Sequence, residues 1–180
     1  MEPGLEATRF YDPYIGTAAN ATHIAVVEVD VDLCAITLSR YVVVEDCGRI
    51  INPMIVEGQA VGGVAQGLGA ALLEEIVYEN GQLMTGSLMD YLVPTAAEMS
   101  QVEVVHLEHP SPSTLGGFKG VGEGGTIGAP AAIANAVADA LAPLGIEIAE
   151  LPITPDRLFH LLAASPASTR PTNANTGPPG

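Results

Sequence analysis

The chain has 180 residues, a formal net charge of −15 and only 6 Lys and Arg residues, which argues against nucleic acid or an anionic membrane as a partner. Its length allows one domain with a real core, or part of a larger domain. Hydrophobic residues make up 48% of the chain but aromatic residues only 4%, so we expect a core of small aliphatic side chains.

The cysteines and the apolar runs indicate in which cellular compartment we expect the chain and whether it crosses a membrane. Cys34 and Cys47 show no CxxC spacing, which indicates neither a disulfide framework nor a zinc site and suggests a reducing, cytoplasmic location. No basic segment followed by an apolar run opens the chain, and Glu57, Gln66 and Asp139 interrupt the longer apolar runs. We therefore expect no signal peptide and no membrane span.

The first predicted element is an antiparallel hairpin. Residues 23–29 and 36–44 are rich in β-branched residues and are separated by a short Asp-containing stretch. We interpret residues 1–21 as an N-terminal extension and residues 22–164 as the domain itself.

A long helix is predicted next. Asn52 and Pro53 are typical N-cap and first-turn residues, and the helix should run to about Ile76. Its interior glycines each cost roughly 1 kcal/mol relative to Ala, so a close neighbour, either backbone or ligand, must compensate. At helical spacing Gln59, Gly63 and Gln66 share one face, where two amides flank bare backbone. The alternative is that these glycines and glutamines serve only packing and capping.

The remaining elements complete an α+β pattern. An Asn-Gly turn predicts a second hairpin at 78–83, and residues 102–107 predict a strand. Residues 129–141 predict an alanine-rich helix, and Thr154 and Pro155 begin a third helix that reaches Leu162. The Pro, Ser, Thr, Asn and Gly residues of 165–180 predict a disordered tail. We expect antiparallel hairpins packed on the glycine-rich and alanine-rich helices.

The loop Lys119-Gly120-Val121-Gly122-Glu123-Gly124-Gly125 is the first candidate site, because it holds a lone carboxylate among four glycines just before a helix. Its GxGxxG spacing matches the dinucleotide fingerprint. We reject that interpretation, since no buried strand leads into the loop and Glu123 would repel a pyrophosphate. The remaining alternatives are a proton-handling site and a flexible connector.

Two opposing effects act on the predicted base. The N-terminus of the following helix favours the anionic form of Glu123, whereas apolar Val121 and Ile127 are expected to reduce its hydration. The result could be a general base that titrates near neutrality.

The second candidate site precedes the long helix. The segment Asp46-Cys47-Gly48-Arg49 offers free backbone N–H groups, a helix N-terminus and a scarce cation, which suits a phosphate. An ordinary strand-to-helix turn is the alternative, and Cys47 is not favoured as a nucleophile because no His stands at a recognisable spacing. The four histidines lack partners of metal-ligand type, so we expect surface or structural roles for His23, His106, His109 and His160.

Five blocks of sequence carry a family resemblance. They are VEVD (27–30), DCGRIINPMIVEGQ (46–59), GGVAQGLGAALLEE (62–75), GQLMTGSLMDYLVPTA (81–96) and KGVGEGGTIGAPAAIANAV (119–137). In order and spacing they resemble the C-terminal part of the large subunit of the molybdenum hydroxylases. This is the xanthine dehydrogenase and aldehyde oxidase superfamily, and the carbon monoxide dehydrogenase large subunits are its most similar branch. The resemblance spans about residues 22–162.

The resemblance implies roles for these residues. Glu123 corresponds to the base beside the molybdenum, which takes the proton from a metal-bound hydroxyl that attacks a carbon of the substrate. Gln59 corresponds to a residue against the pterin, and the 46–52 segment to the part that holds the cytosine dinucleotide of the cofactor. The cofactor-binding set that we infer is Asp46, Cys47, Gly48, Arg49, Asn52, Gln59, Gly63, Gln66, Lys119, Gly120 and Gly122. No residue is expected to ligate molybdenum directly, since the pterin holds it.

The resemblance also implies partners. Such large subunits are several times longer, so we expect an upstream half, an iron–sulfur subunit and an FAD subunit, with carbon monoxide, an aldehyde or an N-heterocycle as substrate. The alternative is a non-catalytic remnant or split-subunit piece that does not bind the cofactor alone. Three departures from the family pattern are Cys34 at a turn position that needs positive φ, Phe118 before Lys119, and Gly124 after Glu123.

Overall fold

The structure is a computed structural model that describes residues 4–12 and 17–165. Its elements in chain order are β1 (Asn20–Asp30), β2 (Ala35–Asp46), α1 (Pro53–Leu72), β3 (Tyr78–Glu79), β4 (Gln82–Leu83), β5 (Val102–His106), α2 (Ala129–Leu141), the 3₁₀ turn η1 (Ala142–Leu144) and α3 (Pro155–Ala164). The α+β class is confirmed. Apart from Ser165, the predicted disordered tail lies outside the described residues, as do residues 1–3 and 13–16 of the predicted extension.

Three strands form the main sheet in the order β1-β2-β5. β1 and β2 are antiparallel from Asn20↔Asp46 to Asp30↔Ala35, which confirms the first hairpin with longer strands than the sequence predicted. β5 pairs in parallel with β2. A parallel neighbour needs a long crossover connection, and α1 and the segment after it supply that connection here.

The turn between β1 and β2 contains the expected non-glycine residue at positive φ. Cys34 adopts a φ of 52°. The Asp30 carboxylate accepts the N–H groups of Asp32 and Leu33, each at 2.9 Å, and so holds the turn closed. A side-chain cap therefore supports the turn that a glycine would otherwise relax.

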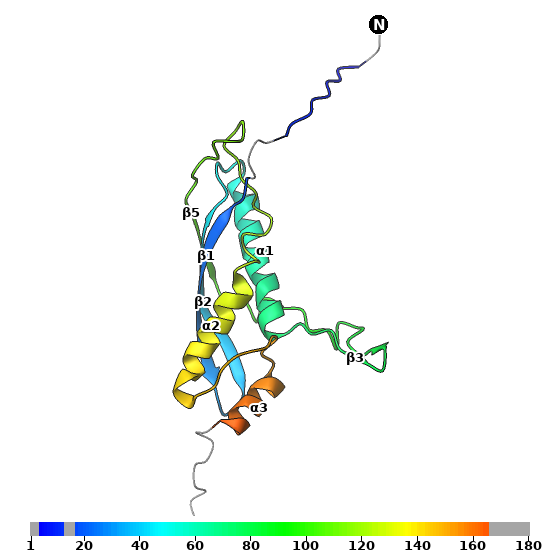
Figure 1. Cartoon of the computed structure of the whole chain (residues 1–180), viewed down its shortest axis with the longest axis vertical. Coiled ribbons are helices and arrows are strands. Elements are labelled where there is room, and N and C mark those ends of the chain that lie inside the picture. The colour runs from blue at the N-terminus through cyan, green and yellow to red at the C-terminus, as the bar shows by residue number, and fades with distance from the viewer. Residues whose placement is uncertain (1–3, 13–16, 166–180) are drawn as a thin grey trace, which may run out of the picture.

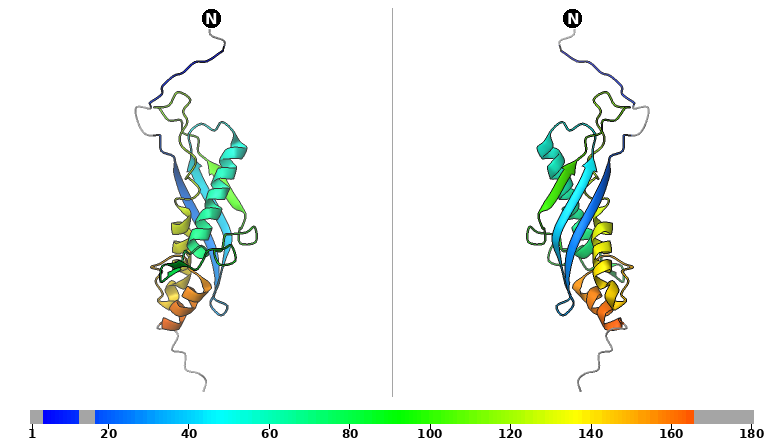
Figure 2. Two further views of the ribbon diagram at one scale, coloured as in Figure 1. Left: turned by 90° about the vertical axis from the view of Figure 1, so that its right-hand side faces the viewer. Right: turned by 90° about the vertical axis from the view of Figure 1, so that its left-hand side faces the viewer.

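Both long helices lie on one face of the sheet, and Figures 1 and 2 show α1 beside α2 with the strands behind or in front of them. The core between the layers is aliphatic apart from Tyr41, and it includes the fully buried Val43, Leu68, Ile133 and Leu158. No described residue covers the opposite face of the sheet, where Ile24 and Val26 are 53% and 48% exposed. The right-hand view in Figure 2 shows this open face.

Helix α1 begins at Pro53, as predicted, but it differs from the prediction at both ends. The Asn52 side chain accepts no capping hydrogen bond; instead the Asn52 carbonyl accepts the N–H of Val56 at 3.2 Å. The helix ends at Leu72 rather than near Ile76, because the N–H groups of Leu73 and Glu74 both donate to the Gly69 carbonyl, at 2.9 and 2.7 Å. The bond from Glu74 spans one residue more than an α-helical bond, so this shared acceptor closes the last turn and the helix does not continue.

The segment after α1 leaves the body of the molecule and carries the second hairpin, which is confirmed as β3 paired with β4. The expectation that this hairpin packs on the helices is wrong, since its strand residues are exposed and it projects away from them. Asn80 and Gly81 both have positive φ, at 50° and 83°, as a type I′ turn requires. Figure 1 shows this arm projecting sideways from the lower end of α1.

Helix α3 shows the predicted cap, since the Thr154 hydroxyl accepts the N–H of Arg157 at 3.2 Å. Ser165 was predicted to begin the disordered tail, and that boundary is wrong. Its side chain is buried and its hydroxyl donates to the Leu144 carbonyl at 2.7 Å, which ties the end of α3 to η1. Among the described residues, no helix is long and apolar enough to cross a membrane.

Candidate active site

Two loops that the sequence marked separately lie side by side. The N–H of Lys119 donates to the Cys47 carbonyl at 2.9 Å, and the N–H of Arg49 donates to the Gly117 carbonyl at 3.1 Å. A Cβ at Gly48 would lie 2.3 Å from the Gly117 oxygen, and Gly48 also has a φ of 71°. The glycine at position 48 is therefore required by this loop-to-loop contact, whatever else the segment binds.

Asp46 is the internal anion of this junction. Its buried carboxylate accepts the N–H of Gly48 at 2.9 Å, the N–H and Nδ1 of His109 at 3.0 and 2.9 Å, and the Lys119 ammonium at 3.0 Å. Burial by itself raises the pKa of Asp46, but these donors outweigh it and bring the pKa to about 2. Asp46 thus joins three segments, and His109 has the structural role that was expected of it.

A small pocket opens beside this junction, at the N-terminus of α1. It has a volume of about 290 Å³, and Cys47, Arg49, Asn52 and Lys119 line it together with apolar side chains from Ile50 to Val56, Phe118 and Val121. The first turn of α1 carries no acidic residue and no side-chain cap, which favours an anion there, although the Glu108 carboxylate accepts the N–H of Ile50 at the edge of the pocket, at 3.3 Å. Exposed Arg49 adds positive charge, and a phosphate fits these groups.

Cys47 lines the same pocket but is not suited to nucleophilic chemistry. Only 5% of the residue is exposed. Burial raises the pKa of its thiol, and the nearby carboxylates of Glu45, Asp46 and Glu108 raise it further.

The glycine face of α1 at Gly63 contacts the loop that contains Gly125. A Cβ at Gly63 would lie 2.7 Å from the Gly125 carbonyl carbon, and a Cβ at Gly125 would lie 2.3 Å from the Ala60 oxygen. The two backbones therefore meet at a distance that only glycine allows on both sides. At Gly63 the predicted close neighbour is confirmed as backbone, the loop that follows Glu123. At Gly58 and Gly62 the prediction is wrong within the described residues, because a Cβ there would meet nothing within 4 Å.

The two glutamines on this face hold the same loop. Gln59 Nε2 donates to the Gly122 carbonyl at 2.8 Å. The Thr126 hydroxyl lies 3.1 Å from the Gly63 carbonyl and 3.4 Å from Gln66 Oε1. Residues 122–126 are thus fixed to α1 along two turns of the helix, and the Gln59 oxygen is not used by these contacts.

Glu123 stands at the exposed side of this docked loop. Its carbonyl accepts the N–H groups of Thr126 and Ile127, both at 3.0 Å, which form the turn into α2. Its side chain is exposed, and Ile127 is 77% exposed. The expectation that Val121 and Ile127 reduce the hydration of Glu123 is therefore wrong within the described residues, because neither covers the carboxylate.

A second pocket lies at this carboxylate. It has a volume of about 460 Å³ and is lined by residues 17–21, 120–124 and 127. Gly120 donates its N–H to the Thr17 carbonyl at 3.0 Å, and a Cβ at Gly122 would meet open space. Val121 lines this pocket and the one at α1, so the two pockets are adjacent. The structure brings the predicted base and the predicted phosphate site to one end of the molecule.

Two residues at this site were not predicted. His23, interpreted as isolated, has Nδ1 2.7 Å from the Tyr41 hydroxyl and Nε2 2.9 Å from the Gly124 carbonyl. Glu45 is buried beside Gly124, with its Oε1 3.3 Å from Nδ1 of His106. The alternation of the strands was the available signal, since it places both residues on the helix-facing side of the sheet.

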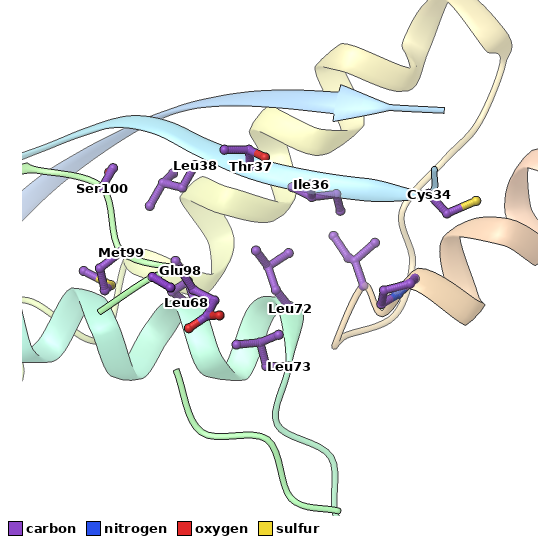
Figure 3. Close-up of a pocket in the computed structure, with 13 residues that line it drawn as sticks. Cys34, Ile36, Thr37, Leu38, Leu68, Leu72, Leu73, Glu98, Met99 and Ser100 are labelled. Carbon is purple, nitrogen blue, oxygen red and sulfur yellow. The ribbon is translucent and has the colours of Figure 1, made fainter. Parts of the chain in front are cut away.

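Another pocket lies at the far end of α1 and shares no residue with the site. It has a volume of about 300 Å³, and Figure 3 shows Leu38, Leu68 and Leu72 pointing into it from β2 and α1. Across the described part of the chain, no group of three or more His, Cys, Asp or Glu residues could hold a metal ion.

Comparisons with known proteins identify the family. Residues 1–100 match the molybdopterin cofactor-binding domain. The chain is 47% identical over 161 residues to the nicotine 6-hydroxylase large subunit of Paenarthrobacter nicotinovorans, covering 89% of this chain and 20% of that protein. It is 38% identical over 162 residues to the carbon monoxide dehydrogenase large chain of Afipia carboxidovorans, with the same coverage.

Solved structures agree with these relatives. Quinoline 2-oxidoreductase from Pseudomonas putida 86 superposes with a TM-score of 0.80 at 50% identity, over 82% of this chain and 19% of that one. A Cu,Mo-containing carbon monoxide dehydrogenase superposes with a TM-score of 0.83 at 37% identity, over 89% of this chain and 20% of that one. The chain thus spans about a fifth of the length of the relatives that it matches. It belongs to the molybdopterin cofactor-binding domain family of the molybdenum hydroxylase large subunits.

Proposed function

We propose that this chain is the cofactor-binding and catalytic-base portion of a molybdenum-dependent hydroxylase that oxidises carbon monoxide, an aldehyde or an N-heterocycle with oxygen from water. The observation that carries the proposal is the exposed Glu123 carboxylate, which lines an open pocket on a loop fixed to α1, next to a second pocket suited to phosphate. The family match supplies the kind of cofactor.

Arg49 and the N-terminus of α1 would hold the phosphates of the cofactor, in its cytosine dinucleotide form. The support is the pocket at this position, which combines a helix N-terminus free of acidic residues with Arg49 and Asn52. Gly120 and Gly122 would let the cofactor approach the loop backbone, since no side chain of their own stands in the way. The free oxygen of Gln59 is placed to accept a hydrogen bond from the pterin.

Asp46 and Lys119 would act on the cofactor indirectly. Their ion pair closes the junction between the two loops, so both residues shape the pocket rather than meet the phosphate as free charges. Gly63 would likewise contribute by letting the Glu123 loop dock on α1.

Glu123 would take up the proton that is released when oxygen from water is added to the substrate. Its exposed position suits this task, because a base must reach the proton it removes within hydrogen-bond distance. The molybdenum cofactor, when bound, supplies the two-electron oxidant. The fixed loop reduces the motion of the base relative to the cofactor.

The rest of the site would come from partners. The two pockets are open in this chain, and we infer that the remainder of a large subunit closes them, while an iron–sulfur subunit and an FAD subunit carry the electrons away. Relatives named as a large chain and as subunit gamma of a dehydrogenase complex support such an assembly. Substrate selectivity would lie in the remainder of the large subunit. The free thiols Cys34 and Cys47 fit a reducing, cytoplasmic location.

The test is Glu123→Gln in the assembled enzyme. We expect turnover to fall by at least about a hundredfold, the lower range for loss of a general base, while molybdenum content stays the same. Glu147→Gln, at an exposed position outside both pockets, is the matched control and should leave both quantities unchanged.

Retained turnover in Glu123→Gln would exclude this residue as the base. An assembly that contains the unaltered chain but no molybdenum would instead favour the alternative, a remnant that no longer binds the cofactor.

A further inference from the structure

We propose that His23, oriented by Tyr41, is a positioning residue that fixes the loop carrying Glu123. The proposal rests on the proposed function only in what the fixed loop is for; the fixing itself follows from three contacts of His23. These contacts come from Tyr41 on β2, from Gly124 after Glu123, and from Gly128, the N-cap residue of α2.

The hydrogen bonds of His23 determine which ring nitrogen carries the proton. The Gly124 carbonyl can only accept, so Nε2, 2.9 Å away, must donate. In the neutral ring Nδ1 then accepts, and the Tyr41 hydroxyl at 2.7 Å is its donor. Burial lowers the pKa of His23, although the hydrogen bond to Gly124 opposes this effect, and the neutral ring is favoured. Tyr41 therefore selects the tautomer that holds Gly124.

The second contact is steric. A Cβ at Gly128 would lie 2.5 Å from Cδ2 of His23, so the backbone at the start of α2 rests directly on the imidazole ring. The loop is attached to His23 at Gly124 and again at Gly128, and Glu123 immediately precedes the first attachment. Tyr41, in turn, is fully buried in the core and packs edge-on to the ring, with centroids 5.8 Å apart. The buried Tyr41 thus restrains the His23 ring, and the ring in turn restrains the loop.

This attachment complements the one on the helix side. Gln59 and Thr126 bind the loop to α1, whereas His23 binds it to the sheet. A loop held from two layers has fewer ways to displace its carboxylate than one held from one layer. Loss of the Nε2–H donor of His23 would therefore release the loop from the sheet but leave it bound to α1.

The test uses two substitutions of one side chain in the full chain. His23→Gln places an amide donor near the position of Nε2 and should keep the bond to Gly124. His23→Asn reaches only the position of Nδ1 and should lose it. We expect the amides of Thr126 and Ile127 to exchange with solvent roughly fivefold faster in His23→Asn and at nearly the original rate in His23→Gln. His160→Gln, an exposed histidine on α3, is the control and should change neither amide.

A spectroscopic readout separates positioning from packing. Long-range ¹H–¹⁵N spectra should show His23 protonated at Nε2 alone in the unaltered chain. Tyr41→Phe removes the donor to Nδ1 but leaves the Gly124 acceptor, so a fraction of the Nδ1-protonated tautomer should appear while the fold persists. His23 protonated at Nδ1, or equal amide exchange in His23→Asn and His23→Gln, would overturn the proposal.

Turnover of the assembled enzyme distinguishes this inference from the assignment of the base. If His23→Asn loosens the loop and also lowers kcat, both hold. If it loosens the loop without any change in kcat, His23 fixes the loop as proposed but turnover does not depend on that fixing, and Glu123→Gln alone decides the assignment of the base.

Discussion

Two adjacent carboxyl groups at the end of β2 experience opposite environments. Burial raises the pKa of Glu45, and His106 only partly offsets this effect. Asp46 is equally buried, yet two backbone N–H groups, Lys119 and His109 bring its pKa to about 2. The difference is the supply of donors, since a buried carboxylate stays ionised only where hydrogen bonds replace its water.

Asp46→Asn tests this view of the loop junction. Because the pKa of Asp46 is lower in the folded chain than its ordinary 3.8, its stabilising effect is present above pH 3.8 and is lost as pH falls toward about 2. We expect the substitution to lower the free energy of unfolding at pH 7 by about 2 kcal/mol, with a smaller difference at pH 3. Urea unfolding at both pH values measures it, with Asp32→Asn in the exposed turn as control. An equal difference at both pH values would show that the charge of Asp46 is not the cause.

The glycines of helix α1 differ in whether a neighbouring segment packs against them. Gly63 is buried against the backbone of Gly125, whereas a Cβ at Gly62 or Gly58 would meet nothing within 4 Å. Sequence alone treats these glycines alike, because all of them lower helix propensity by the same amount. The loop that docks on one side of the helix separates them.

Gly63→Ala and Gly62→Ala form a matched pair for this element. At Gly62 the new methyl group enters open space, so we expect stability to rise by up to about 1 kcal/mol from helix propensity. At Gly63 the methyl group would overlap Gly125, so we expect a loss of about 1–3 kcal/mol through displacement of the loop. Thermal or urea unfolding of both variants gives the comparison. Stabilisation by both would mean that the loop is not docked on α1.

At the scale of the whole molecule, the described residues form two layers, a sheet and the helices on one of its faces, and the other face of the sheet is open. Ile24 and Val26 on β1 and Val105 on β5, which is 37% exposed, form an apolar strip on the open face of the sheet. Leu88 and Met89 on the projecting arm are 79% and 89% exposed. Exposed apolar surface of this kind marks an interface, and the relatives are about five times as long as the matched region. Under the proposed function, the remainder of the large subunit would cover the open face.

Ile24→Lys tests that inference. The side chain is about half exposed, so the fold should persist, with a melting temperature within a few degrees of the original. Co-purification with a separately expressed upstream part of the subunit should fall sharply, because a lysine would be buried without a partner. Ile24→Val keeps the apolar character and should co-purify normally. Undiminished assembly of the lysine variant would exclude this face as the contact.

Much of the fold was predictable from local signals. The hairpins, the proline-started helices and the Thr154 cap depend on residues a few positions apart, and all of them are confirmed. The end of α1 and the boundary at Ser165 were wrong because distant contacts and the final turn set them. At the candidate site, the sequence singled out Glu123 and Arg49 by their chemistry, whereas it gave no reason to single out His23. Its partners, Tyr41 and Gly124, are 18 and 101 residues away along the chain.

The sequence by itself determined the family, the element types and the two glycine-containing loops with their charged residues, because motif order and local propensity are written in neighbouring positions. Only the tertiary structure decided what those glycines approach and which layer each loop binds. Gly63 meets Gly125 and His23 meets Gly124 across the layers of the fold. Such contacts depend on how helices and strands stack, and local sequence does not encode that stacking. The sequence therefore identifies the loop around Glu123 as a motif, and the structure shows that both α1 and the sheet hold it.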